Sequence, residues 1–130
     1  MKKPNAHLGM RHIALNVINI TACKYFYVEL LHMTLAWQPD AENVYLTSGT
    51  DNLALHTLKD ADHFNQPQHL DHLGFFLKTR EDVDQWYDYL RAHDVEMKAA
   101  PKDHRDGTRS FYCADPEGNI VQMIYYPLPG

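Results

Sequence analysis

The pattern of apolar and polar positions along the chain occurs twice. Apolar residues alternate over 10–17 and again over 69–78, and each segment carries a histidine near its start, His12 and His72, 60 positions apart. Such alternation predicts a strand with one buried face. The same offset of 60 relates Phe26 to Trp86 in helically spaced segments that follow the two strands. Because an internal repeat constrains the architecture more strongly than a single motif, we predict two equivalent units.

Each unit is expected to contain a strand, a helix and three further strands. In the first unit we expect a helix over 22–32 and strands over 35–37, 44–47 and 52–58. In the second, we expect a helix that starts at Thr79 with a capping box to Asp82, and strands over 95–99, 109–113 and 119–126. The sequence therefore predicts an α+β fold of two βαβββ modules in a single domain, residues 1–130. Module one is expected over about 9–58, a linker over 59–68 and module two over about 69–127.

Strand alternation also predicts which polar side chains share a face. By this criterion His12, His56, His72 and Gln122 point away from the helices, and His56 would be the counterpart of Gln122. Taken alone, each of these residues is more commonly an ordinary polar residue than a metal ligand. Together, three imidazoles and an amide are costly to bury unless something satisfies them, and imidazole is a frequent metal ligand. A metal site and four unrelated polar residues are the two interpretations.

Composition excludes several classes of partner. The net charge of −5 argues against nucleic acid, which requires a basic face. No apolar stretch is long enough to cross a bilayer, and no apolar segment of a secretory signal follows Lys2 and Lys3. Cys23 and Cys113 lack metal-type spacing, so we expect buried free thiols. These features together predict a cytoplasmic protein.

The segment Arg109–Met123, with its turn Asp115-Pro116-Glu117-Gly118-Asn119, resembles the closing strand-turn-strand of the vicinal oxygen chelate superfamily. This superfamily comprises glyoxalase I, bleomycin and fosfomycin resistance proteins, and extradiol dioxygenases. Phe26-Tyr27 with Leu30-Leu31, and His12 in the opening strand, are also similar to the family. The resemblance implies an open, cup-shaped, eight-stranded mixed sheet with helices on its convex face. It also implies a homodimer and a divalent metal ion such as Zn, Ni, Mn or Fe.

The resemblance places the metal ligands at His12, His56, His72 and Gln122. Active members of the family usually have glutamate where Gln122 stands. An amide oxygen still ligates a metal, but glutamine does not take up a proton near neutral pH, so the general base of the isomerases is missing and the catalytic residue is unknown. His32 likewise replaces a glycine of the family at the end of the first helix.

Two functions remain open. The first is a metalloenzyme, lyase, isomerase or dioxygenase-like, that activates a small oxygen-bearing substrate through a Lewis acid. Its substrate would be bound by Arg109, Tyr112, Phe76 and Trp37. The second is a non-catalytic protein of the bleomycin-resistance type that sequesters a flat ligand between aromatic side chains. A hydrolase with Cys113 as nucleophile is disfavoured, because no helix N-terminus is expected to lower its pKa.

Overall fold

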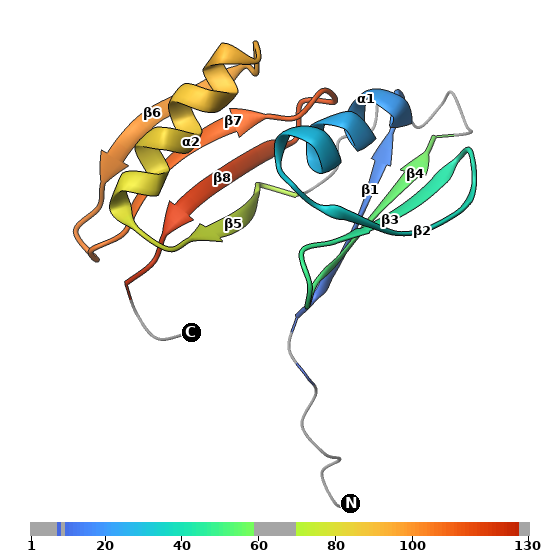
Figure 1. Cartoon of the computed structure of the whole chain (residues 1–130), viewed down its shortest axis with the longest axis horizontal. Coiled ribbons are helices and arrows are strands. Elements are labelled where there is room, and N and C mark those ends of the chain that lie inside the picture. Colours follow the sequence, from blue (N-terminus) through green and yellow to red (C-terminus); the bar gives the residue numbers. More distant parts are fainter. Residues whose placement is uncertain (1–7, 9, 59–69, 128–130) are drawn as a thin grey trace, which may run out of the picture. The chain divides into compact units, whose positions relative to one another are not determined.

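The computed structural model describes residues 8, 10–58 and 70–127 (Figure 1). The chain divides into two compact units, residues 1–61 and 62–130, and each is described by itself. The predicted linker over 59–68 lies outside the described residues.

The first unit consists of one mixed sheet and one helical segment. Its elements are β1 (His12–Val17), α1 (Ile20–Lys24), the π-helix η1 (Tyr25–Leu30), β2 (Thr34–Asp40), β3 (Asn43–Thr47) and β4 (Asn52–Thr57). The strand order is β1-β4-β3-β2. β1 and β4 are parallel, and the other pairs are antiparallel.

The second unit repeats this topology. It contains β5 (Leu73–Leu77), α2 (Arg80–Ala92), β6 (Met97–Asp103), β7 (Arg109–Ala114) and β8 (Ile120–Tyr125) in the strand order β5-β8-β7-β6. Figure 1 shows α2 lying across one face of this sheet. The predicted α+β fold of two βαβββ modules is therefore confirmed. The joining of all eight strands into one cup stays a prediction.

The predicted strand faces are confirmed in β1 and β8, whereas Leu53, Ala54 and Leu55 of β4 are all buried. Leu15 and Val17 in β1, and Val121 and Met123 in β8, are buried. His12, Ala14 and Asn16 are exposed. The expected capping box is also present: Thr79 and Asp82 bond each other's backbone N–H groups and start α2. Apolar burial on one face thus leaves the opposite face of each sheet to polar side chains.

Two predicted elements differ from the structure. The first helix begins at Ile20, where Asn19 caps it, and from Tyr25 onward it widens into a π-helix. Leu31 accordingly donates its backbone N–H to Phe26, five residues back. This wider turn brings Phe26, Tyr27 and Leu30 into the core.

The strand expected to end at Ala99 instead continues as β6 through Pro101 to Asp103, and β2 includes Pro39. Both are edge strands with register shifts in their pairing. A proline is tolerated at an edge because its missing N–H need not pair with a neighbouring strand.

Candidate functional site

Two of the predicted ligands in the second unit lie beside the same tyrosine. His72 immediately precedes β5, and Gln122 in β8 pairs with Gly74, two residues after His72. The Tyr112 ring contacts the His72 ring edge to face with centroids 5.5 Å apart. Its hydroxyl accepts a hydrogen bond of 3.1 Å from Gln122 Nε2. The structure therefore brings His72 and Gln122 together on the face of the sheet opposite α2.

His12 in β1 and His72 before β5 are held by the same kind of contact, from Nδ1 to a side-chain oxygen. His12 Nδ1 lies 2.7 Å from Asn52 Oδ1, and His72 Nδ1 lies 2.7 Å from Asp71 Oδ2. Both oxygens only accept, so each Nδ1 donates, and in a neutral imidazole with this tautomer Nε2 carries the lone pair. An imidazole with one nitrogen held by a carboxylate or carbonyl oxygen is the usual arrangement of a metal-ligating histidine.

The amide of Gln122 is also oriented. Its Nε2 donates to Ser110 Oγ at 3.2 Å and to Tyr112. Its Oε1 lies towards Gly74, where a Cβ would come within 3.6 Å of it. The nitrogen end is thus held by two hydroxyls, and the oxygen end is left available for a ligand.

The expected equivalence of His56 and Gln122 is wrong. Gln122 pairs with Gly74, whereas the corresponding pair in the first unit is Ala14 with Ala54. His56 pairs with Asn16, four positions beyond His12, which is about 13 Å along the strand. Asn43, on the strand next to it, holds its Nδ1 at 2.7 Å. His56 is therefore not aligned with Gln122, and Ala54 occupies that place.

The donor chemistry fits a divalent ion, with two imidazole nitrogens and one amide oxygen. Within the described part of the chain, no three His, Cys, Asp or Glu side chains cluster as a metal site does. The third donor of this set, Gln122, is not of these residue types. His12 belongs to the first unit, and His72 and Gln122 belong to the second.

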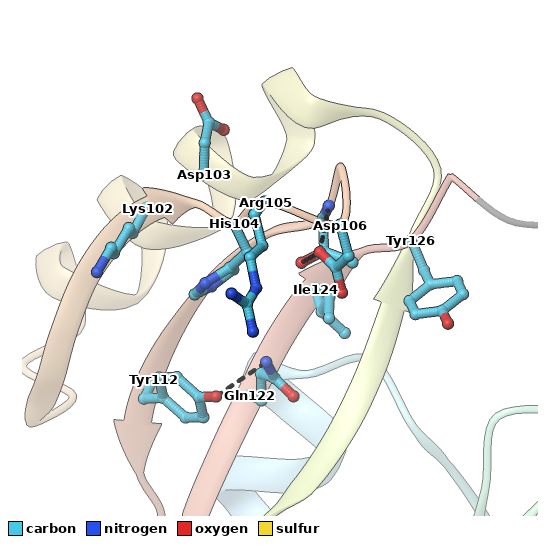
Figure 2. Close-up of a pocket in the computed structure, with 10 residues that line it drawn as sticks. Lys102, Asp103, His104, Arg105, Asp106, Tyr112, Gln122, Ile124 and Tyr126 are labelled. Carbon is cyan, nitrogen blue, oxygen red and sulfur yellow. Dashed lines mark hydrogen bonds between the residues drawn. The ribbon is translucent and has the colours of Figure 1, made fainter.

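A pocket of about 520 Å³ opens beside Gln122 in the second unit (Figure 2). We call it the Gln122 pocket, and it is lined by Lys102, Asp103, His104, Arg105, Asp106, Thr108, Tyr112, Gln122, Ile124 and Tyr126. Figure 2 shows Arg105 extending from the loop after β6 towards Gln122 and Tyr112. Cationic side chains and a candidate ligand therefore share one cavity.

The two carboxylates of the Gln122 pocket already have partners. Hydrogen bonding from Arg109 lowers the pKa of Asp103, which also pairs with Arg80. The backbone N–H and the hydroxyl of Thr108 bond the carboxylate of Asp106 and lower its pKa. No hydrogen bond or ion pair to another described residue is found for Lys102 or Arg105. The pocket therefore presents unpaired positive charge, which favours an anionic ligand.

The four residues expected to bind substrate occupy different places. Tyr112 lines the pocket. Phe76 is 71% exposed and stacks on Tyr126 at 5.4 Å, at the rim. Trp37, in the first unit, is 60% exposed and stacks on Tyr45 at 5.2 Å.

Arg109 makes its contacts with carboxylates of α2 and β6. Its guanidinium bonds Asp84 of α2 at 2.7 Å and Asp103 at 3.1 Å. The hydrogen bonds that it donates to Asp84, followed by those that it donates to Asp103, raise the pKa of Arg109. Arg109 therefore joins α2 to the sheet, and we assign it no substrate role.

Sequence reasoning did not identify Asn52, Asp71, His104 or Ser110. Asp71 directly precedes His72, and this adjacency was a usable signal. Asn52 and Ser110 acquire their roles only through strand register, which brings residues distant in sequence together. His104 directly follows β6, and no pattern in the sequence indicated that it would meet Ser110.

Cys23 and Cys113 are both buried and free, as expected. Burial raises the pKa of Cys113 to about 12, so its thiolate is scarce at neutral pH. This supports the exclusion of a cysteine nucleophile. None of the helices in the described residues is both long and apolar enough to cross a bilayer.

Several known proteins are similar to this chain. The metallothiol transferase FosB of Staphylococcus epidermidis is 28% identical over 116 residues, which cover 88% of this chain and 80% of that protein. FosB of Staphylococcus saprophyticus is 26% identical over 116 residues, covering 88% and 75%.

Among solved structures, a lactoylglutathione lyase from Agrobacterium tumefaciens superposes with a TM-score of 0.74 at 20% identity, covering 93% of this chain and 96% of that one. The fosfomycin resistance protein FosX of Listeria monocytogenes gives a TM-score of 0.76 at 18% identity, covering 95% and 94%. These two likenesses show a shared fold. The family model described as Glyoxalase/Bleomycin resistance protein/Dioxygenase superfamily matches residues 9–123, and the chain belongs to that superfamily.

Proposed function

We propose that the protein is a metal-dependent enzyme that acts on a small anionic, oxygen-bearing substrate. In this proposal His12, His72 and Gln122 hold a divalent ion, and the Gln122 pocket binds the substrate. The ion would supply Lewis-acid polarisation of a substrate oxygen. The observation that carries the proposal is the matched orientation of the donors: Nδ1 of both imidazoles is held by a side-chain oxygen, and the nitrogen of the amide is held by hydroxyls.

Three protein ligands leave room for substrate. A catalytic metal site keeps at least one position open, whereas a fourth protein ligand tends to close a tetrahedral shell. We leave His56 out of the ligand set, because the strand register separates it from His12 by four positions. Its ring lies edge-on to Tyr45 at 5.8 Å.

The chemistry of position 122 limits the reaction class. Glutamine does not accept a proton near neutral pH, so an isomerisation that needs a base at this position is disfavoured. Polarising a substrate oxygen for attack by an external nucleophile does not need that base. The similarity to metallothiol transferases makes a thiol the nucleophile that we propose.

Binding of the substrate anion is assigned to Lys102 and Arg105. Both line the pocket, and its two carboxylates are engaged by Thr108 and by Arg80 with Arg109. Tyr112 offers a hydroxyl at the same site. A phosphate, phosphonate or carboxylate group has the charge that this arrangement requires.

Two experiments on the full-length protein test the proposal. One is elemental analysis of protein purified without an affinity tag, and the other is a thiol-transfer assay. We expect about one equivalent of a divalent metal per chain and metal-dependent consumption of thiol with fosfomycin as the test electrophile. Metal loss in His72→Ala, with retention in His56→Ala, would support the ligand set. Wild-type protein that binds no added Mn²⁺, Zn²⁺, Ni²⁺ or Fe²⁺ would contradict it.

A second candidate function is sequestration without chemistry, and the exposed aromatic pairs favour it. Trp37 with Tyr45 and Phe76 with Tyr126 form near-parallel stacks, with interplanar angles of 23° and 9°. A flat ligand could stack on such surfaces. Tryptophan fluorescence that is quenched by a ligand in metal-free protein, with no thiol consumption, would favour this function.

We also propose a homodimer. In the described residues each sheet ends in edge strands, β1 and β2 in one unit and β5 and β6 in the other. Open strand edges promote pairing with another chain. Light scattering should give about twice the chain mass of 15.1 kDa, and a single 15.1 kDa species would contradict a dimer.

A further inference from the structure

The partners of the Gln122 amide do not by themselves determine its orientation. Nε2 donates to the hydroxyls of Ser110 and Tyr112. A hydroxyl both donates and accepts. Each would therefore bond equally well to Oε1 if the amide were rotated by half a turn, which would turn the nitrogen end towards the ligand side. A further group must therefore fix which end of the Gln122 amide, nitrogen or oxygen, faces Ser110.

His104 lies where it can fix this orientation. Its Nε2 lies 3.1 Å from Ser110 Oγ, the same oxygen that accepts from Gln122 Nε2. Ser110 is only 2% exposed, so water does not readily replace a missing partner. In the tautomer that carries its proton on Nδ1, Nε2 of a neutral imidazole accepts a hydrogen bond from the hydroxyl, and the hydroxyl oxygen is then left to act only as an acceptor.

We propose that His104 is a positioning residue for Gln122 and acts through Ser110. The Ser110 O–H donates to His104 Nε2, so Ser110 Oγ accepts from Gln122 Nε2 and Oε1 remains on the ligand side. The consequence for metal binding rests on the proposed function, in which Oε1 is a ligand. A glutamate at position 122 would need no positioning residue of this kind, because the two oxygens of a carboxylate are equivalent. The two ends of an amide differ.

The first test uses metal-free, full-length protein. Side-chain amide resonances of Gln122 are followed by NMR in wild type, His104→Phe, His104→Gln and Ser110→Ala, with His93→Phe as the control. His93 is an exposed histidine at the end of α2 whose ring bonds Tyr89. We expect solvent exchange of the Gln122 amide protons to rise about threefold to tenfold in His104→Phe and Ser110→Ala. His104→Gln, whose amide oxygen also accepts, should restore slow exchange, and His93→Phe should not change it.

Unchanged exchange in folded His104→Phe would overturn the proposal, and so would unchanged exchange in Ser110→Ala. Chemical-shift dispersion of the backbone amides reports whether each variant is folded. If His104→Phe does not fold, His104→Leu and Ser110→Ala decide the question by the same readout.

The second test is a double-mutant cycle on Mn²⁺ affinity. In the native background, His104→Phe should weaken binding about 10- to 100-fold, as for other groups that orient a metal ligand. In the Gln122→Glu background the same substitution should change affinity less than about twofold. Equal losses in both backgrounds would overturn the proposal, because they would show an effect unrelated to amide orientation. Wild-type protein that binds no metal would defeat the proposed function, while the NMR result would still decide whether His104 orients the amide.

Discussion

Gly74 lies directly opposite Gln122 in the parallel pairing of β5 with β8, and a Cβ at position 74 would lie 3.6 Å from Gln122 Oε1. That distance is an ordinary van der Waals contact, so alanine fits the space. A methyl group there would nevertheless cover one side of the oxygen that we propose as a ligand. The glycine thus keeps the ligand side of Gln122 open.

Gly74→Ala should therefore separate stability from metal binding. Replacing a strand glycine by alanine is expected to raise the free energy of unfolding by about 0.5–1 kcal/mol. Binding of Mn²⁺, measured by isothermal titration calorimetry, should weaken at the same time. A variant that is stabilised and binds Mn²⁺ as well as wild type does would contradict the role given to Gln122 Oε1.

The asparagines that hold the histidines provide a matched pair of variants. Asn52→Ala removes the acceptor of His12, and Mn²⁺ affinity should fall about 10- to 100-fold. Asn43→Ala removes the acceptor of His56, together with bonds of its amide to Asp40, and should leave affinity within about twofold. Asp71→Ala should resemble Asn52→Ala. A larger loss at Asn43 than at Asn52 would return His56 to the ligand set and remove His12.

Anion binding should depend on Lys102 and Arg105, which have no ionic partner among the described residues. Arg105→Gln and Lys102→Gln should each weaken the binding of inorganic phosphate about 10-fold, the loss expected when a hydrogen bond to a charged group is removed. Lys98→Gln is the control, since Lys98 lies on β6 like Lys102 but pairs with Glu96 at 3.2 Å. Calorimetric titrations at low ionic strength measure all three variants. Equal losses in Lys98→Gln and Arg105→Gln would point to general charge instead of a defined pocket.

The buried thiol of Cys113 predicts how stability changes at alkaline pH. Its pKa is raised from 9.0 to about 12 in the folded protein, so the unfolded chain releases the proton first as pH rises. The stabilisation is complete below about pH 9 and declines as pH rises towards 12, at up to about 1.4 kcal/mol per pH unit. Urea unfolding of wild type and Cys113→Ala between pH 8 and about 10.5 isolates this contribution. Parallel stability curves for the two proteins would contradict it.

The repeat in the sequence was sufficient to predict both modules, because the apolar alternation in β1, β5 and β8 reports directly which face each strand buries. It also placed His12, His72 and Gln122 on the face away from the helices. Alternation does not, however, fix how far one strand slides along its neighbour. The pairing of His56 with Asn16, and of Gln122 with Gly74, is a property of register, and the error over His56 came from there.

The other differences arise from tertiary contacts that a sequence pattern does not record. Helical spacing from 22 to 32 predicts a helix but not its type, and the structure has a π-helix from Tyr25 onward in which Tyr27 is buried. The loop after Asp103 shows no periodic pattern that predicts its contacts. Thr108 donates to Asp106, and Arg105 has no ionic partner among the described residues. Both features depend on how this loop folds back on β7.

The most direct test of the account is an anomalous-difference map from a crystal of the full chain grown with Mn²⁺. We expect one strong peak within about 2.2 Å of Nε2 of His12, Nε2 of His72 and Oε1 of Gln122, with His56 outside the coordination shell and Nδ1 of both ligating histidines still bonded to Asn52 and Asp71. A map with no peak at these atoms, or a peak bound through Nδ1 or at His56, would contradict the proposed ligand set of His12, His72 and Gln122.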